Sequence, residues 1–234
     1  VGNYAFEDCS GLTSITIPNS VMSIGSSAFK GCSGLSSITI PFVGATKDGT
    51  SNTHLGYIFG ASSYSYNSNY VPASLKTVII TGGTKIADSA FYQCSGLTSV
   101  TIPDGVTIIE ESAFEECTGL KSITIPETVT VINDYTFSGC TGLTEVNLPE
   151  DLTTIYRYAF QNCTSLVSID LLSTHLISTP VTALLGLFSN DYAHLGIVET
   201  GARMLSLIEN GSAKPSMKTL QYLAARLGKN LSYF

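Results

Sequence analysis

Hydrophobic and polar residues recur along this chain with a period of 23 residues. One representative unit, at residues 113–132, reads AFEECTGLKSITIPETVTVI. Leu120, Ile123 and Ile125 are apolar and polar residues flank the isoleucines, so this period-2 alternation predicts a short β-strand with one buried face. Pro126 ends the strand because proline has no N–H to donate to a ladder. The Ala-Phe-x-x-Cys stretch before the strand predicts a short helical turn, and the part after the proline predicts an irregular crossing.

Two side chains mark six units, a phenylalanine and, three residues later, a cysteine. The marked positions are Phe6, Phe29, Phe91, Phe114, Phe137 and Phe160, with Cys9, Cys32, Cys94, Cys117, Cys140 and Cys163. The interval between Cys32 and Cys94 is 62 residues, which equals two periods of 23 plus 16, and Phe59 fits the unit in between. We therefore expect about seven units over residues 1–171, one of them expanded by an insertion at about 43–72.

A unit of this length cannot bury its own apolar edge, so stacked neighbours must bury it. Strands of successive units then pair in parallel, which predicts an α/β solenoid whose phenylalanines and cysteines form ladders in one core. Gly119 and its equivalents are expected to allow a tight bend before each strand. Cysteines at one repeat position lie about 4.8 Å apart with parallel Cβ vectors, so buried free thiols are expected rather than disulfides. The sequence contains no CxxC or HxxxH pair, so no metal site is expected.

The motif A-F-x-x-C-x-x-L-x-x-I-x-I-P-x-x-V-x-x-I resembles the BspA-type (Treponema-type) leucine-rich repeats of bacterial surface proteins over about residues 1–171. The resemblance implies a curved, right-handed leucine-rich repeat solenoid with short parallel strands, used for adhesion. The expected function is therefore a non-enzymatic binding or adhesion module, with a protein or glycan on a host or neighbouring cell as its partner. The expected location is the cell surface or the medium, with a signal peptide upstream of Val1.

The insertion holds the candidate ligand-binding residues Tyr57, Tyr64, Tyr66 and Tyr70. They stand among Ser, Asn and Gly, the composition of adaptable protein-binding loops, and long loops on a rigid scaffold often carry function. The alternative interpretation is that some of these tyrosines only hold the loop against the solenoid. The outward positions of the strands, mostly Ser and Thr, form either a second polar binding platform or an ordinary solvated face.

Charge and motifs exclude several other classes of function. The net charge of −7 and the pI of about 4.8 argue against binding nucleic acid or anionic lipid through a basic surface. The chain contains no run of 18 apolar residues, so membrane insertion is not expected. Enzyme signatures such as G-x-S-x-G and H-E-x-x-H are absent, so no catalytic residue and no cofactor is expected. Four glutamates in one unit are expected to form a solvated acidic face: Glu110, Glu111, Glu115 and Glu116.

Residues 172–234 lack the 23-residue period and carry leucines at helical spacing, which predicts a small α-helical C-terminal segment. Residues 204–234, with the run I-E-N-G at 208–211, resemble the C-terminal half of a Cro/C1-type (Xre) helix-turn-helix domain. That resemblance implies an alternative function, an intracellular repeat protein with a DNA-binding tail, in which Arg203 and Ser206 would contact DNA. The same segment could instead cap the open end of the solenoid or be a fusion artefact.

Overall fold

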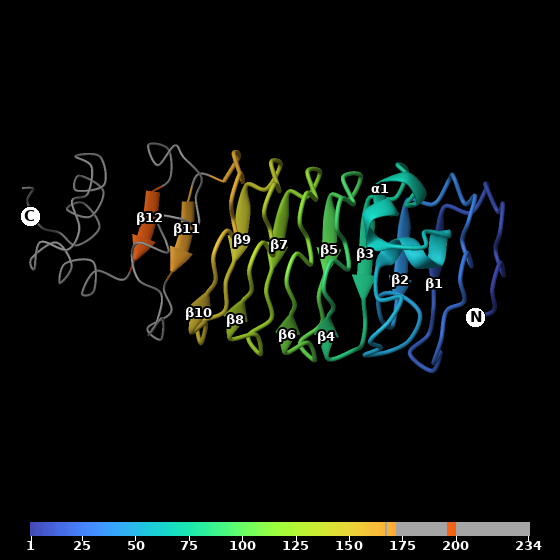
Figure 1. Cartoon of the computed structure of the whole chain (residues 1–234), viewed down its shortest axis with the longest axis horizontal. Helices are drawn as coiled ribbons and strands as arrows, with labels where there is room; N and C mark the ends of the chain where they lie inside the picture. Colours follow the sequence, from blue (N-terminus) through green and yellow to red (C-terminus); the bar gives the residue numbers. More distant parts are fainter. Residues whose placement is uncertain (167, 172–195, 200–234) are drawn as a thin grey trace, which may run out of the picture.

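The computed structural model describes residues 1–166, 168–171 and 196–199, and these form a solenoid of stacked coils (Figure 1). One strand of each coil lies beside the next along the solenoid. These strands are β1 (Ser14–Thr16), β2 (Ser37–Ile40), β3 (Thr77–Ile80), β5 (Ser99–Thr101), β7 (Ser122–Thr124), β9 (Glu145–Asn147), β11 (Ser168–Leu171) and β12 (Gly196–Glu199).

The strands pair in parallel and in register, which confirms the predicted architecture. β1, β2, β3 and β5 form one sheet in that order, while β7 pairs with β9 and β11 with β12. Ile38 lies beside Ile15 on one side and Val78 on the other. β5 also contacts β7, and β9 contacts β11. Inward side chains such as Ile123 are buried and outward ones such as Thr124 are exposed.

A second set of short strands follows the opposite edge of the solenoid, where the sequence predicted an irregular crossing (Figure 1). They are β4 (Lys85–Ile86), β6 (Ile108–Ile109), β8 (Val131–Ile132) and β10 (Thr154–Ile155), and β4 pairs with β6 and β8 with β10, again in parallel. Each has only two residues, one facing out and one buried, so the alternation is too short to recognise from the sequence. The crossing is therefore more regular than expected.

The predicted helical turn around the repeat phenylalanine is a series of hydrogen-bonded turns instead. Two residues of each such turn have left-handed backbone torsions, for example Ser112 at φ 52° and Glu116 at φ 57°. A left-handed residue cannot continue a right-handed helix, so the chain bends sharply at both sites.

The repeat phenylalanines stack ring on ring within the core, from Phe6 to Phe29 and from Phe91 to Phe160. Phe114 lies 5.0 Å from Phe91 and 5.4 Å from Phe137 between ring centroids, with interplanar angles of 4° and 10°. In the expanded unit Phe59 is buried against Phe29 at 6.2 Å, with a tilt of 49°. The ladder does not begin as expected, because Cys9 is exposed and Phe6 is only partly buried.

Buried cysteines hydrogen-bond between coils as well as filling space. Cys117 Sγ donates to the carbonyl oxygen of Phe91 at 3.0 Å, and Cys140 Sγ donates to that of Phe114 at 3.1 Å. All six cysteines are free. Burial raises the pKa of the Cys163 thiol to about 12, so this thiol keeps its proton at neutral pH and remains a donor.

Gly119 allows two neighbouring coils to approach closely, whereas the sequence predicted that it allows a tight bend. Its backbone torsion lies outside the left-handed region. A Cβ there would collide with Ser95 O and would lie 2.6 Å from Leu97 O, both backbone atoms of the preceding coil. Gly11 occupies the same repeat position in the first coil, where a Cβ would meet nothing within 4 Å.

We expect Gly119→Ala to lower the free energy of unfolding by about 1–3 kcal/mol, because the added methyl group forces two coils apart. Gly11→Ala is the matched control and should change stability by no more than about 1 kcal/mol. Urea unfolding followed by circular dichroism measures both variants. Equal effects of the two substitutions would contradict a role for Gly119 in coil spacing.

β12 lies within the segment 172–234, where the sequence predicted helices, and it continues the parallel ladder from β11. The alternation of Gly196–Glu199 covers only four residues and carries neither repeat marker, which is why sequence reasoning missed this strand. The expected helices at 205–227 lie outside the described residues.

Candidate binding surface

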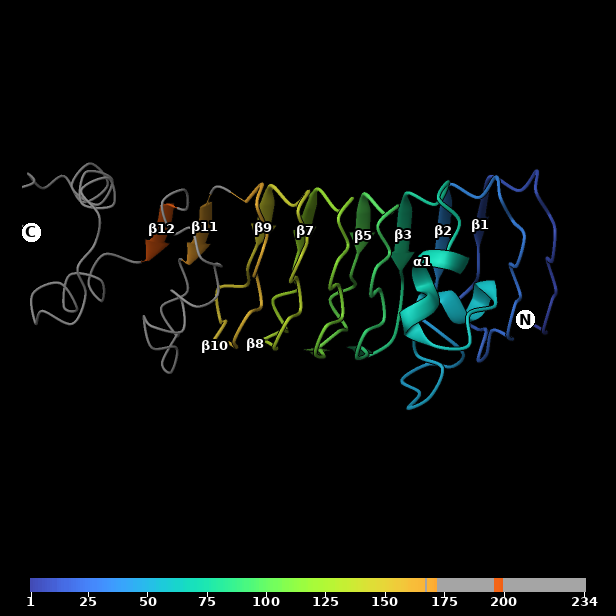
Figure 2. The same cartoon turned by 45° about the horizontal axis from the view of Figure 1, so that its top comes forward.

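The insertion enters the solenoid through the short 3-10 helix η1 (Leu55–Phe59), beside β2 and β3 (Figure 2). Its apolar residues Leu55, Ile58 and Phe59 are buried in the common core. Ile58 O accepts a hydrogen bond from Phe29 N at 2.8 Å, and Leu55 N donates to Ala90 O at 2.8 Å. η1 therefore stands in for a coil between its two neighbours and holds the rest of the insertion in place.

A fully buried asparagine joins η1 to the two helical turns that follow, η2 (Tyr64–Tyr66) and α1 (Asn67–Tyr70). Asn67 Oδ1 accepts hydrogen bonds from Gly56 N at 3.0 Å and from His54 Nδ1 at 2.9 Å. Asn67 Nδ2 donates to Tyr92 O of the next coil at 3.0 Å. Because the Gly56 N–H requires an oxygen at this position, Oδ1 is the shared acceptor and His54 carries its proton on Nδ1.

His54 is held neutral at this junction. Burial lowers the pKa of its imidazole, and the hydrogen bond with Asn67 only partly offsets that effect. Tyr57 lies close by, with its ring edge-on to His54 at 6.4 Å between centroids, and it packs half-buried against the core. Of the four candidate tyrosines, Tyr57 thus borders the core and belongs to the base of the insertion.

The other three candidates, Tyr64, Tyr66 and Tyr70, are exposed, by 46%, 49% and 44%. Tyr64 is supported by Tyr92 of the next coil, whose ring it meets edge to face at 5.5 Å and 86°. Tyr70 lies over Gly60, since a Cβ on that glycine would be 3.5 Å from the tyrosine ring. Tyr64, Tyr66, Tyr70 and Tyr92 together are called the tyrosine surface below.

Sequence reasoning missed Tyr92, although a signal was present. In each unit the residue after the repeat phenylalanine is polar or glycine, as in Lys30, Gly60 and Glu115, and Tyr92 is the one aromatic residue at that position. The exception falls in the unit directly after the insertion. An aromatic residue that breaks a polar repeat position therefore indicates where the insertion docks.

A small hollow of about 140 Å³ lies between α1 and the next coil, lined by chain neighbours of Tyr66, Tyr70 and Tyr92 rather than by the tyrosines themselves. Ser68, Val71 and Gln93 are among its lining residues. Lys76 also lines it, and its ammonium group donates to the carbonyl oxygens of Ala73 at 2.7 Å and Gly96 at 3.2 Å. The volume is below the roughly 300 Å³ of the smallest drug-sized pockets, so it suits a single ring or side chain.

The part of the insertion that follows Asp48 is uncharged but has acidic residues nearby. No Asp, Glu, Lys or Arg occurs between Asp48 and Lys76. On the following coil, Glu116 Oε2 accepts a hydrogen bond from Gln93 Nε2 at 2.8 Å. Burial raises the pKa of the Tyr92 hydroxyl, and the charges of Glu116 and Glu115 raise it further. A ligand at the tyrosine surface therefore meets neutral polar groups, with the carboxylates of Glu115 and Glu116 beyond Tyr92 and the Lys30–Glu7 ion pair beside Gly60.

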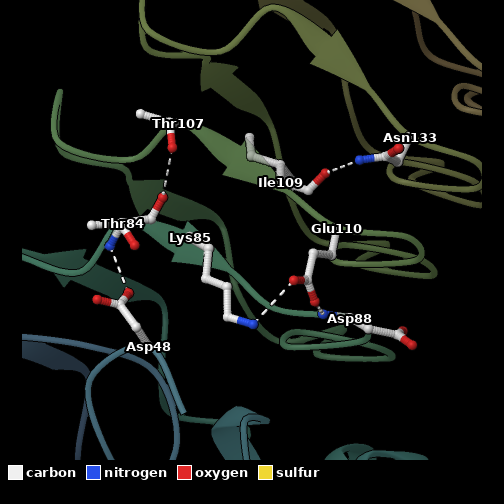
Figure 3. A network of polar contacts seen from close by, with 8 residues as sticks. All are labelled: Asp48, Thr84, Lys85, Asp88, Thr107, Ile109, Glu110 and Asn133. Carbon is white, nitrogen blue, oxygen red and sulfur yellow. Dashed lines mark hydrogen bonds and ion pairs between the residues drawn. The ribbon is translucent and has the colours of Figure 1, made fainter. Parts of the chain in front are cut away.

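Figure 3 shows how the base of the insertion is attached to the second strand ladder. Asp48 Oδ1 accepts the backbone N–H of Thr84 at 2.7 Å, and this bonding lowers the pKa of Asp48 although burial acts to raise it. Next to it, Glu110 forms an ion pair with Lys85 at 3.1 Å and accepts the N–H of Asp88 at 2.9 Å. Glu110 was expected on a solvated face, but it is a structural group that braces neighbouring coils.

The remaining predictions concern residues that are not brought to this surface. Arg203 and Ser206, the candidate DNA contacts, lie outside the described residues. Among the residues that the structure describes, no group of three or more His, Cys, Asp or Glu could hold a metal ion. No helix within the described part of the chain is long and apolar enough to cross a membrane.

Comparison with known proteins identifies similar repeats. A family model described as the BspA-type leucine-rich repeat region matches residues 1–53 and 59–183 in six copies. A leucine-rich repeat protein from Bacteroides ovatus is 34% identical, with a TM-score of 0.50, over 72% of this chain and 39% of that protein. A leucine-rich cell surface protein from Faecalibacterium prausnitzii is 33% identical, with a TM-score of 0.39, over 73% of this chain and 36% of that protein.

A third solved structure, the leucine-rich repeat protein of T. pallidum, is 25% identical over 71% of this chain and 70% of its own length, with a TM-score of 0.43. The chain thus spans less than half the length of the first two structures. No curated protein gives a significant match. The resemblance of residues 204–234 to a helix-turn-helix domain finds no support in these comparisons.

Proposed function

Because the chain belongs to the BspA-type leucine-rich repeat family, we propose that it is a non-enzymatic binding module that recognises a partner through the tyrosine surface. Proteins of this family are typically displayed at the cell surface and bind other proteins through their repeats. We place this chain at the cell surface or in the secreted fraction on the same basis, and a protein or glycan of a neighbouring cell is its proposed partner.

The observation that carries the proposal is the rigid presentation of three exposed tyrosines. Their rings are about half exposed, yet Tyr64 rests on Tyr92, and Asn67 fixes the turns that bear them to two coils. Tyrosine offers a large contact area with few rotatable bonds, so little conformational entropy is lost on binding. Loops with this composition on a fixed scaffold are typical of recognition surfaces.

The test replaces Tyr64, Tyr66 and Tyr70 together by serine, which removes the rings while the surface stays neutral. We expect the full chain to bind cultured epithelial cells saturably in flow cytometry and the triple variant to bind at least tenfold more weakly. Tyr156→Ser is the matched control, since Tyr156 is 48% exposed on a coil away from the insertion. Equal binding by the wild type and the triple variant would refute this site.

A further inference from the structure

We propose that the tyrosine surface and the adjoining hollow bind an uncharged carbohydrate chain. This inference rests on the proposed function and names the chemistry of its ligand. Three properties of the surface carry it: its area, its lack of charge, and the polar groups around the rings.

The exposed aromatic area matches a ligand of a few sugar rings. With 46%, 49% and 44% of their surfaces exposed, Tyr64, Tyr66 and Tyr70 together offer roughly 300 Å². The available area suits a few sugar rings, and the hollow of about 140 Å³ beside α1 has room for one ring.

The charges around the tyrosine surface determine which class of carbohydrate it favours. The segment between Asp48 and Lys76 holds no acidic or basic residue, whereas Glu115 and Glu116 lie one coil further on, beyond Tyr92 and Gln93. A sulfated or sialylated glycan would meet these like charges, which costs binding free energy. The two cations near the surface are already engaged: Lys76 donates to two backbone carbonyls, and Lys30, which lies beside Gly60 and Tyr70, is ion-paired with Glu7 at 2.8 Å. The surface therefore favours a neutral ligand.

The polar groups around the rings match the hydroxyls of a sugar. Ser68 and Asn69 are exposed on α1, and Ser68 Oγ lies 3.5 Å from Gln93 Oε1 across the edge of the hollow. Amide and hydroxyl groups donate and accept hydrogen bonds without carrying charge. The exposed rings of Tyr64, Tyr66 and Tyr70, on the helical turns that also carry Ser68, offer apolar faces for the C–H groups of a pyranose ring. Both requirements of a neutral sugar are thus met side by side.

The test passes the full chain over an array of neutral hexasaccharides of glucose, xylose, mannose and N-acetyllactosamine, with sulfated and sialylated counterparts. We expect saturable binding to at least one neutral chain, with a Kd of about 0.1–1 mM, and no tighter binding to its anionic counterpart. Tyr64→Ser and Ser68→Leu, which fills the hollow, should each weaken that binding at least tenfold. Tyr156→Ser should leave it unchanged. Absence of binding to every neutral chain, or tighter binding to anionic ones, would overturn the inference.

A second experiment, on cell binding, distinguishes a failure of this inference from a failure of the proposed function. Mild periodate oxidises the vicinal diols of surface glycans, and we expect it to abolish binding of the chain to epithelial cells. Binding that survives periodate but is lost in the triple tyrosine variant would leave the binding module intact and refute the carbohydrate ligand. Binding that survives both treatments would refute both proposals.

Discussion

Phe114→Ala is expected to lower the free energy of unfolding by about 3–5 kcal/mol. Phe114 is fully buried in the middle of the stack and contacts a ring on each side, Phe91 at 5.0 Å and Phe137 at 5.4 Å. Truncation removes both ring contacts and leaves a cavity that the backbone cannot close. The backbone is fixed there by hydrogen bonds between coils, such as Phe114 N to Thr136 O at 2.9 Å.

Urea unfolding followed by circular dichroism measures this loss, and an unchanged slope against urea shows that the same part of the chain unfolds in both proteins. Phe6→Ala is the control, because Phe6 is only partly buried and stacks on one ring alone, Phe29 at 5.1 Å. That substitution should cost about 1–2 kcal/mol. A Phe114 variant no less stable than the Phe6 variant would disprove that the ring stack from Phe91 to Phe160 stabilises the core.

Asn67→Ala is expected to cost about 2–4 kcal/mol, because it leaves buried polar groups without partners. The Gly56 N–H and His54 Nδ1 both donate to Asn67 Oδ1, and Tyr92 O accepts from Asn67 Nδ2. Loss of these bonds should release the insertion from the next coil. Hydrogen exchange at Gly56 and limited proteolysis within residues 49–75 report that release directly, alongside the urea midpoint.

Asn69 supplies a matched control on the same helix α1. It is exposed, and its side-chain oxygen accepts one hydrogen bond, from Ser68 Oγ at 3.0 Å. Asn69→Ala should therefore change stability by less than about 0.5 kcal/mol and leave proteolysis unaltered. If both alanine variants behaved alike, Asn67 would not be the junction that holds the insertion.

The repeat architecture could be predicted because each of its signals occurs in unit after unit. The positions of Phe114, Cys117 and Ile123 all recur every 23 residues, so a local ambiguity in one unit is resolved by the others. The crossing strands escaped prediction since a two-residue strand such as Val131–Ile132 has no period to recognise. The prediction for Gly119 was wrong for another reason. Its contact with the preceding coil depends on the spacing between units, and the sequence of one unit does not show that spacing.

The binding surface could be predicted only in part, because the insertion occurs once and has no repeat to average over. Its tyrosines were recognisable by composition, but the difference between half-buried Tyr57 and exposed Tyr66 depends on how η1 enters the coil. Asn67 could not be recognised at all. From the sequence, an asparagine among serines is expected to be solvated. Its burial depends on hydrogen-bond partners distant in the sequence, such as Gly56 and Tyr92, which lie 11 and 25 residues away.

The direction of the hydrogen bonds between coils determines how this molecule responds to force. Bonds such as Phe137 N to Ala159 O link one coil to the next, so they run along the axis of the solenoid. Tension along that axis loads them in series, and the coils peel off one at a time rather than shearing together. Each released coil of 23 residues would lengthen the chain by about 75 Å. The stack would thus yield stepwise under flow, dissipating mechanical work while the remaining coils stay folded.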